Sequence, residues 1–310
     1  MTTGSFEGVL APVLTPFKAD LSPDTERFVA FCHWLVDQGI DGLAAFGTTS
    51  EANSQSIEER MALLEAAIEG GVPAAKFMPG TGCCALTDSV RATEHAVKLG
   101  CGGVLMLPPF YYKGMTDEGL HSAFSEVIQR VGDDRLKIYL YHIPPQAQVD
   151  ISLELIEMLV KDYPDTVVGL KDSSGDWSNT QAVIDAFPGF DVFPGSEVFL
   201  LDGLRAGGVG CITATGNANP AGIRKVFENW EGDQADDLQA AITATRKIIQ
   251  ARPMVPALKA ILAHYHDDPS WATVRPPMVT LDAEARAGLI ANLEADGFTI
   301  APRRLEDAAE

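Results

Sequence analysis

The sequence has few basic residues. Its 310 residues include 23 lysines and arginines against 43 aspartates and glutamates, which gives a formal net charge of −20. A surface with this excess of negative charge repels nucleic acid and anionic membranes. We therefore expect neither nucleic acid nor a membrane among the partners of this protein.

Long apolar runs and export signals are also missing. No stretch contains eighteen consecutive apolar residues, and Met1 to Glu7 lack a basic region followed by an apolar one. The cysteines are odd in number and none are spaced as C-x-x-C, so we expect reduced core or near-core thiols in a cytoplasmic protein. A catalytic cysteine is the alternative, with Cys83-Cys84 as its candidate. The five are Cys32, Cys83, Cys84, Cys101 and Cys211.

What the sequence does contain is a regular alternation of short β-rich apolar segments with helical patterns of period 3.6. Such alternation indicates an α/β fold with a parallel sheet, and eight units predict a (β/α)8 TIM barrel. A doubly wound sheet is the alternative, but no G-x-G-x-x-G follows the first strand. The predicted strands are Val9–Leu14, Gly42–Phe46, Ala75–Pro79, Gly103–Leu107, Lys137–His142, Val167–Lys171, Asp191–Pro194 and Gly210–Thr215.

Several positions predict helix ends. Ser22-Pro23 and Ser56, the latter with Glu59 three residues on, are N-cap signals. Gly39, Gly70 and Gly100 follow predicted helices, where a positive φ is wanted.

After Pro220 the pattern becomes purely helical. We predict a barrel over residues 1–223 and a C-terminal α-helical region over residues 224–310. This region has no strands of its own, so we expect it to pack outside the barrel or to build a subunit contact.

Lys171 is the most informative residue. It lies at the end of the apolar segment Val167–Lys171 and is followed by a loop. Burial disfavours the ammonium form, so an amine held there is a usable nucleophile that forms Schiff bases with carbonyls. The alternative is a lysine whose stem is buried while its amine reaches water.

Other polar residues follow the neighbouring strands, at the end where a (β/α)8 barrel carries its chemistry. Tyr141 is expected beside Lys171, within reach to shuttle protons. Thr48 and Thr49 offer hydroxyl and backbone donors for a carboxylate, or simply cap a turn. His142 is interpreted as a packed strand residue, and Tyr111-Tyr112 fits interface packing equally well. The six histidines form no ligand cluster with carboxylates or cysteines, so we predict no metal site.

Three ordered motifs produce a family resemblance. Gly47-Thr48-Thr49-Ser50-Glu51, Tyr141-His142-Ile143-Pro144 and Gly169-Leu170-Lys171-Asp172 resemble the dihydrodipicolinate synthase / N-acetylneuraminate lyase superfamily. Thr15-Pro16-Phe17 and Tyr111-Tyr112 match it too, and the resemblance covers nearly the whole chain.

The resemblance implies a role for each matching residue. Lys171 would form the Schiff base with pyruvate or a pyruvate-derived 2-oxo acid, and Tyr141 would be the general acid/base. Thr48 would link Tyr141 to Tyr112 of a neighbouring subunit in a homotetramer, a dimer of dimers. Thr48 and Thr49 would hold the substrate carboxylate. The family uses no metal or organic cofactor, and the pocket would be lined by Gly195 and Ile212.

Three positions depart from the family pattern. His142 replaces the usual asparagine and Ser50 the usual glycine. Gln146 stands where a dihydrodipicolinate synthase typically has the arginine that binds aspartate semialdehyde, and it cannot form a bidentate charged pair. Gln146 therefore favours a lyase, either an aldolase or a dehydratase, that acts on a 2-keto-3-deoxy acid or a 4-hydroxy-2-oxo acid. The expected small-molecule partners are pyruvate and an aldehyde. The alternatives are a 4-hydroxy-tetrahydrodipicolinate synthase and a non-catalytic protein that binds a 2-oxo acid.

Overall fold

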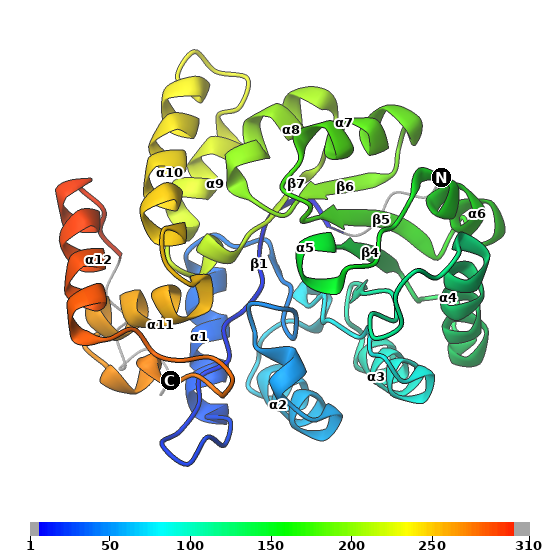
Figure 1. Ribbon diagram of the computed structural model, residues 1–310, viewed down its shortest axis with the longest axis horizontal. Helices are drawn as coiled ribbons and strands as arrows, with labels where there is room; N and C mark the ends of the chain where they lie inside the picture. The colour runs from blue at the N-terminus through cyan, green and yellow to red at the C-terminus, as the bar shows by residue number, and fades with distance from the viewer. Residues whose placement is uncertain (1–5, 301–310) are drawn as a thin grey trace.

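A ring of parallel strands forms the centre of the protein, as seen in a computed structural model that describes residues 6–300 (Figure 1). Residues 1–5 and 301–310 lie outside this range. Most of the stretch from Met1 to Glu7, where we expect no export signal, is therefore outside the described residues. The strands pair in two groups, β2-β1-β7 and β3-β4-β5-β6. They are β1 (Gly8–Ala11), β2 (Gly42–Leu43), β3 (Val104–Met106), β4 (Ile138–His142), β5 (Val167–Asp172), β6 (Asp191–Pro194) and β7 (Gly210–Ile212).

The two groups join into a closed barrel at two places. The segment from Phe77 to Gly80 bridges β2 and β3, since Phe77 pairs with Leu43 and Gly80 with Leu105. On the other side, the Val209 amide donates to the Val192 carbonyl at 3.2 Å. The predicted third strand, Ala75–Pro79, is therefore wrong as a regular strand: residues Ala74–Lys76 form a 3-10 turn, and only two isolated bridges remain.

Helices surround the strands and connect each strand to the next, as expected for a (β/α)8 barrel. The short helix α5 lies beside the end of β4 (Figure 1). The helices that connect the strands are α1 (Thr25–Asp37), α2 (Ile57–Glu69), α3 (Leu86–Leu99), α4 (Asp117–Val131), α5 (Pro144–Ala147), α6 (Leu153–Asp162), α7 (Trp177–Ala186) and α8 (Leu200–Ala206).

Local signals set the helix ends. Ser56 and Glu59 form the predicted capping box of α2. The prediction for α1 was wrong by two residues, because the Asp24 side chain accepts from the Arg27 amide and caps the helix. Gly39 and Gly100 have the expected positive φ of 90° and 82°, whereas after α2 Gly71 has φ 94° in place of the predicted Gly70.

Two apolar layers stabilise the barrel. The larger lies between strands and helices, where buried side chains such as Val9, Leu35 and Leu140 meet. The smaller fills the barrel interior and includes Leu10, Leu105, Tyr139, Tyr141 and Ile212. Tyr141 on β4 and Ile212 on β7 are therefore side chains of the barrel interior, near the carboxyl ends of their strands.

The C-terminal helices gather on one side of the barrel, next to α1 (Figure 1). They are α9 (Pro220–Glu228), α10 (Ala235–Gln250), α11 (Met254–Tyr265) and α12 (Ala283–Ala295). The predicted division at residue 223 falls within α9 and stays a prediction. No helix among residues 6–300 is both long and apolar enough to cross a membrane.

Candidate active site

Lys171 and Tyr141 are direct neighbours across two strands. They are paired in the parallel register of β5 and β4. Lys171 is 4% exposed and Tyr141 is 3% exposed, and the Lys171 Nζ lies 3.3 Å from the Tyr141 hydroxyl. This is the only hydrogen bond of the amine within residues 6–300, and no carboxylate in that range pairs with it. The amine is thus buried with one weakly acidic partner, as a carbonyl-attacking lysine requires.

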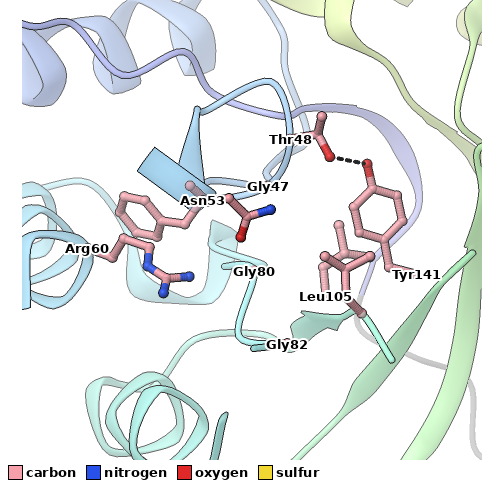
Figure 2. Close-up of a pocket in the computed structure, with 11 residues that line it drawn as sticks. Gly47, Thr48, Asn53, Arg60, Gly80, Gly82, Leu105 and Tyr141 are labelled. Carbon is pink, nitrogen blue, oxygen red and sulfur yellow. Dashed lines mark hydrogen bonds between the residues drawn. The ribbon is translucent and has the colours of Figure 1, made fainter. Parts of the chain in front are cut away.

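Thr48 adds a third hydroxyl to this pair. Its Oγ1 lies 3.4 Å from the Tyr141 hydroxyl, as Figure 2 shows. A cavity of about 10 Å³ adjoins both side chains and has room for about one water molecule. Asn53 and Arg60 also line that cavity (Figure 2). The Tyr141 hydroxyl therefore lies between the Lys171 amine and the Thr48 hydroxyl, a position from which it can pass protons.

The loop after β2 is fixed by buried hydrogen bonds. Thr49 and Ser50 are buried. The Ser50 hydroxyl donates to the Val13 carbonyl at 2.5 Å, and the Thr15 hydroxyl donates to the Ser50 carbonyl at 2.9 Å. Ser50, which replaces the usual glycine of the family, thus links the loop to the segment after β1.

Gly195 and Ile212 lie at the same end of the barrel. The Gly195 amide donates to the Asp172 carbonyl at 2.6 Å, directly beside Lys171. A Cβ at position 195 would lie 2.1 Å from the Ser173 Oγ, so only glycine fits this close approach. Ile212 is fully buried in the barrel interior with Tyr141.

His142 is a packed strand residue, as predicted. It is buried, and its Nδ1 accepts from the Ile151 amide at 3.0 Å. Burial lowers the pKa of His142 below its usual range, and the nearby Asp172 and Asp150 only partly oppose this shift. The neutral imidazole therefore holds the chain after α5 rather than acting on a substrate.

Two predicted site residues are not joined to the others within one chain. Tyr112 is 69% exposed, packs edge-on against Tyr111, and forms no hydrogen bond with Thr48 among the described residues. Gln146 is exposed on α5, and its side chain forms no hydrogen bond with Lys171 within residues 6–300. A role for either residue in the site therefore stays a prediction.

No cysteine forms a hydrogen bond with Lys171 among the described residues 6–300. Cys32 and Cys211 are buried, but Cys84 is exposed, so the expectation of a core or near-core thiol is wrong for Cys84. Cys83 and Cys84 line a cavity of about 320 Å³ between α3 and α4, outside the barrel. All five cysteines are free. Residues 6–300 contain no group of three or more side chains arranged to hold a metal ion.

One buried charged pair near the site was not predicted. Glu51, at the end of the Gly47–Glu51 motif, lies 2.5 Å from the Nζ of Lys259 on α11. The available signal was a single lysine inside an otherwise apolar helix, since charged residues are seldom fully buried without a partner.

Comparison with known proteins identifies the family. The family model described as the dihydrodipicolinate synthetase family matches residues 5–296. The chain belongs to the dihydrodipicolinate synthetase family. The predicted family is therefore confirmed, and its members similar to this chain include DapA-like lyases and 4-hydroxy-tetrahydrodipicolinate synthases.

Three of the similar proteins cover almost the whole chain. An uncharacterized DapA-like lyase of Chloroflexus aurantiacus is 35% identical over 289 residues, which is 93% of this chain and 96% of the relative. The crystal structure of dihydrodipicolinate synthase from Agrobacterium tumefaciens superposes with a TM-score of 0.87 at 29% identity. The superposition covers 94% of this chain and 99% of the synthase. YagE of Escherichia coli K12, a family member solved with pyruvate, gives 0.86 at 25% identity with the same coverage. The predicted TIM barrel and lyase class are confirmed.

Proposed function

We propose that this lyase captures pyruvate, or the pyruvate part of a 2-keto-3-deoxy acid, as a Schiff base on Lys171. The observation that carries this proposal is the buried amine of Lys171, which lies 3.3 Å from the Tyr141 hydroxyl and has no carboxylate partner within residues 6–300. The amine adds to the C2 carbonyl and forms a carbinolamine. Loss of its hydroxyl as water, with a proton delivered by Tyr141, leaves the protonated imine.

The imine then serves as an electron sink for breaking the C3–C4 bond. Tyr141 accepts the proton of the substrate C4 hydroxyl, an aldehyde departs, and the electron pair moves to the imine and forms an enamine. A proton added at C3 and hydrolysis of the imine release pyruvate and restore the amine. The same steps in reverse condense pyruvate with an aldehyde.

The substrate carboxylate would be bound by the loop after β2. Thr48 and Thr49 offer hydroxyls and backbone amides, and such donors bind carboxylates well. Gly195 and Ile212 would form the wall around the methyl end of pyruvate, and a side chain at position 195 would displace this wall because its Cβ would collide with Ser173 and the Asp172 carbonyl. No metal or organic cofactor takes part in this scheme.

A second subunit would complete the site. Tyr112 is exposed with Tyr111 and Met115 on one loop, and this apolar patch fits contact with another copy of the chain. In a homotetramer built as a dimer of dimers, Tyr112 would reach Thr48 of the neighbouring subunit and extend the proton path from Tyr141. The free cysteines fit a cytoplasmic enzyme.

The acceptor end of the substrate is proposed from Gln146. A neutral, exposed amide suits the hydroxyl groups of a 2-keto-3-deoxy acid better than a second carboxylate. Release of pyruvate from a panel of 2-keto-3-deoxy acids tests this choice. The alternative is a 4-hydroxy-tetrahydrodipicolinate synthase, favoured by the 29% identity to the dihydrodipicolinate synthase of Agrobacterium tumefaciens. Turnover of pyruvate with aspartate semialdehyde, coupled to the downstream reductase, would support that alternative.

A further inference from the structure

A second lysine is buried even more deeply than Lys171. Lys259 lies on α11 of the C-terminal helices, and its side chain is 0% exposed. Its Nζ lies 2.5 Å from the Glu51 Oε1 and donates to the Thr273 carbonyl at 2.7 Å. Both members of the pair are shielded from water, so the amine is held in place and has no path to a carbonyl substrate.

Glu51 links this lysine to the carboxylate-binding loop. It directly follows Thr48, Thr49 and Ser50, and its amide donates to the Thr48 carbonyl at 3.1 Å. Its backbone is in the left-handed region, with φ of 57°, although it is not glycine. Such a conformation costs free energy and persists only where the surroundings hold it. The Glu51 carboxylate therefore anchors a strained turn at the base of the loop.

The groups that bind the Glu51 carboxylate among residues 6–300 belong to the C-terminal helical region. Lys259 binds one carboxylate oxygen of Glu51, and the Arg275 amide donates to the other at 2.8 Å. The Arg275 side chain pairs with Glu59 and donates to the Ser54 carbonyl at 2.7 Å. Both cations also flank the Phe17 ring, at 4.4 Å and 4.6 Å from its centroid. The loop that carries Thr48 and Thr49 is thus held by segments far away in the sequence.

We propose that Lys259 is a positioning residue for the reaction: through Glu51, it holds Thr48 and Thr49 in the geometry that binds the substrate carboxylate. This inference rests on the proposed function of the loop. A buried ion pair is no better for stability than a well-packed apolar pair, whereas the loss of one partner leaves an uncompensated charge. The pair is therefore explained by what it fixes, the left-handed turn at Glu51, rather than by the stability it adds.

The test compares the wild type with Lys259→Met and with the double variant Lys259→Met/Glu51→Gln, in which no buried charge is left unpaired. The matched control is Arg224→Met, which breaks the Arg224–Asp41 ion pair ahead of β2, at the opposite end of the barrel. For each protein we would measure the melting temperature, the KM for pyruvate or for the 2-keto-3-deoxy acid, kcat, and hydrogen exchange in residues 47–55.

We expect Lys259→Met to raise KM by about tenfold or more, since a misplaced binding group far from the chemistry has effects of this size. Exchange in residues 47–55 should rise at the same time. The double variant should recover melting temperature but keep the raised KM and the faster exchange. Arg224→Met should lower the melting temperature and leave KM and the exchange of this segment unchanged.

Two results would overturn the inference: unchanged exchange of residues 47–55 in both Lys259 variants, or a double variant in which KM and exchange return to the wild-type values. If Lys259→Met does not fold, the double variant alone decides between these outcomes. Failure of the wild type to form a pyruvate adduct would reject the proposed function instead, and the exchange measurement would still judge the role of Lys259.

Discussion

The Lys171 amine lies 3.3 Å from the Tyr141 hydroxyl, and the two residues face each other in register on β5 and β4. The pairing of two adjacent parallel strands thus sets the distance between the two side chains that we propose as nucleophile and acid/base. A one-residue change in the register between these strands would move one side chain to the other face of the sheet. Both proposed groups are therefore positioned by strands of the barrel rather than by a loop.

Replacing Tyr141 by phenylalanine should slow turnover by about 100-fold to 10,000-fold, because it removes the proton-transferring hydroxyl and keeps the ring. Steady-state kinetics should show this loss mainly in kcat. The control is Tyr139→Phe, two residues earlier on β4, where the hydroxyl contacts the Phe6 amide and the Asp191 carboxylate. Equal losses in both variants would argue against a catalytic role for Tyr141.

Tyr112 should act across a subunit boundary. We would co-express Lys171→Ala with Tyr112→Phe under different tags and isolate the mixed assemblies. Each parent variant should be nearly inactive, but the mixture should recover activity, because one of its sites combines an intact Lys171 with an intact Tyr112 from the neighbour.

The matched control for this mixture pairs Lys171→Ala with Tyr141→Phe, two residues that belong to the same subunit's site. That mixture should recover nothing. A Tyr112 mixture that stays as inactive as this control would show that Tyr112 does not serve a neighbouring site.

A charge at position 146 should change the preferred acceptor. Gln146→Arg should raise kcat/KM for aspartate semialdehyde by about tenfold or more, since a guanidinium binds a carboxylate through two charged hydrogen bonds. Gln148→Arg adds the same charge at another exposed position nearby and should have little effect. Competition assays with both classes of acceptor would measure the change, and identical behaviour of the two variants would count against a role for residue 146 in selecting the acceptor.

His142 should make stability depend on pH. Burial lowers its pKa in the folded state below the usual 6.5, so at intermediate pH the unfolded chain binds more protons than the folded one. The free energy of unfolding should therefore fall as the pH drops through about 6.5, the pKa of an unperturbed histidine. Urea unfolding at several pH values would measure this.

The control for that experiment is His142→Asn, which cannot titrate and should flatten the pH dependence in this range. His264→Asn, a change at a half-exposed position, should leave it as in the wild type. A wild type and His142→Asn with the same pH slope would contradict the account of His142.

Much of the barrel could be predicted because its signals are local. The β6 segment Asp191–Pro194 matches its predicted bounds, because it is a short, fully buried run of the kind expected for a strand in a parallel sheet. The third strand failed for a physical reason. Pro79 has no N–H to donate to a neighbouring strand, and the 3-10 turn just before it leaves few residues to pair.

The site could be predicted where motif residues lie at strand ends, and not where distant segments meet. Lys171, Tyr141 and Thr48 come together because barrel strands end at one face. The contact between Lys259 and Glu51 depends on how α11 packs against the loop after β2, and no local pattern encodes that packing. The position of Tyr112 depends on a second copy of the chain.

The most direct test of the account is borohydride reduction in the presence of pyruvate, followed by peptide mass mapping. We predict one reduced pyruvate adduct on Lys171, none on the buried Lys259, and none at all in Lys171→Ala. A wild-type protein that takes up no adduct, or an adduct that persists in Lys171→Ala, would contradict the central claim that Lys171 captures the 2-oxo acid.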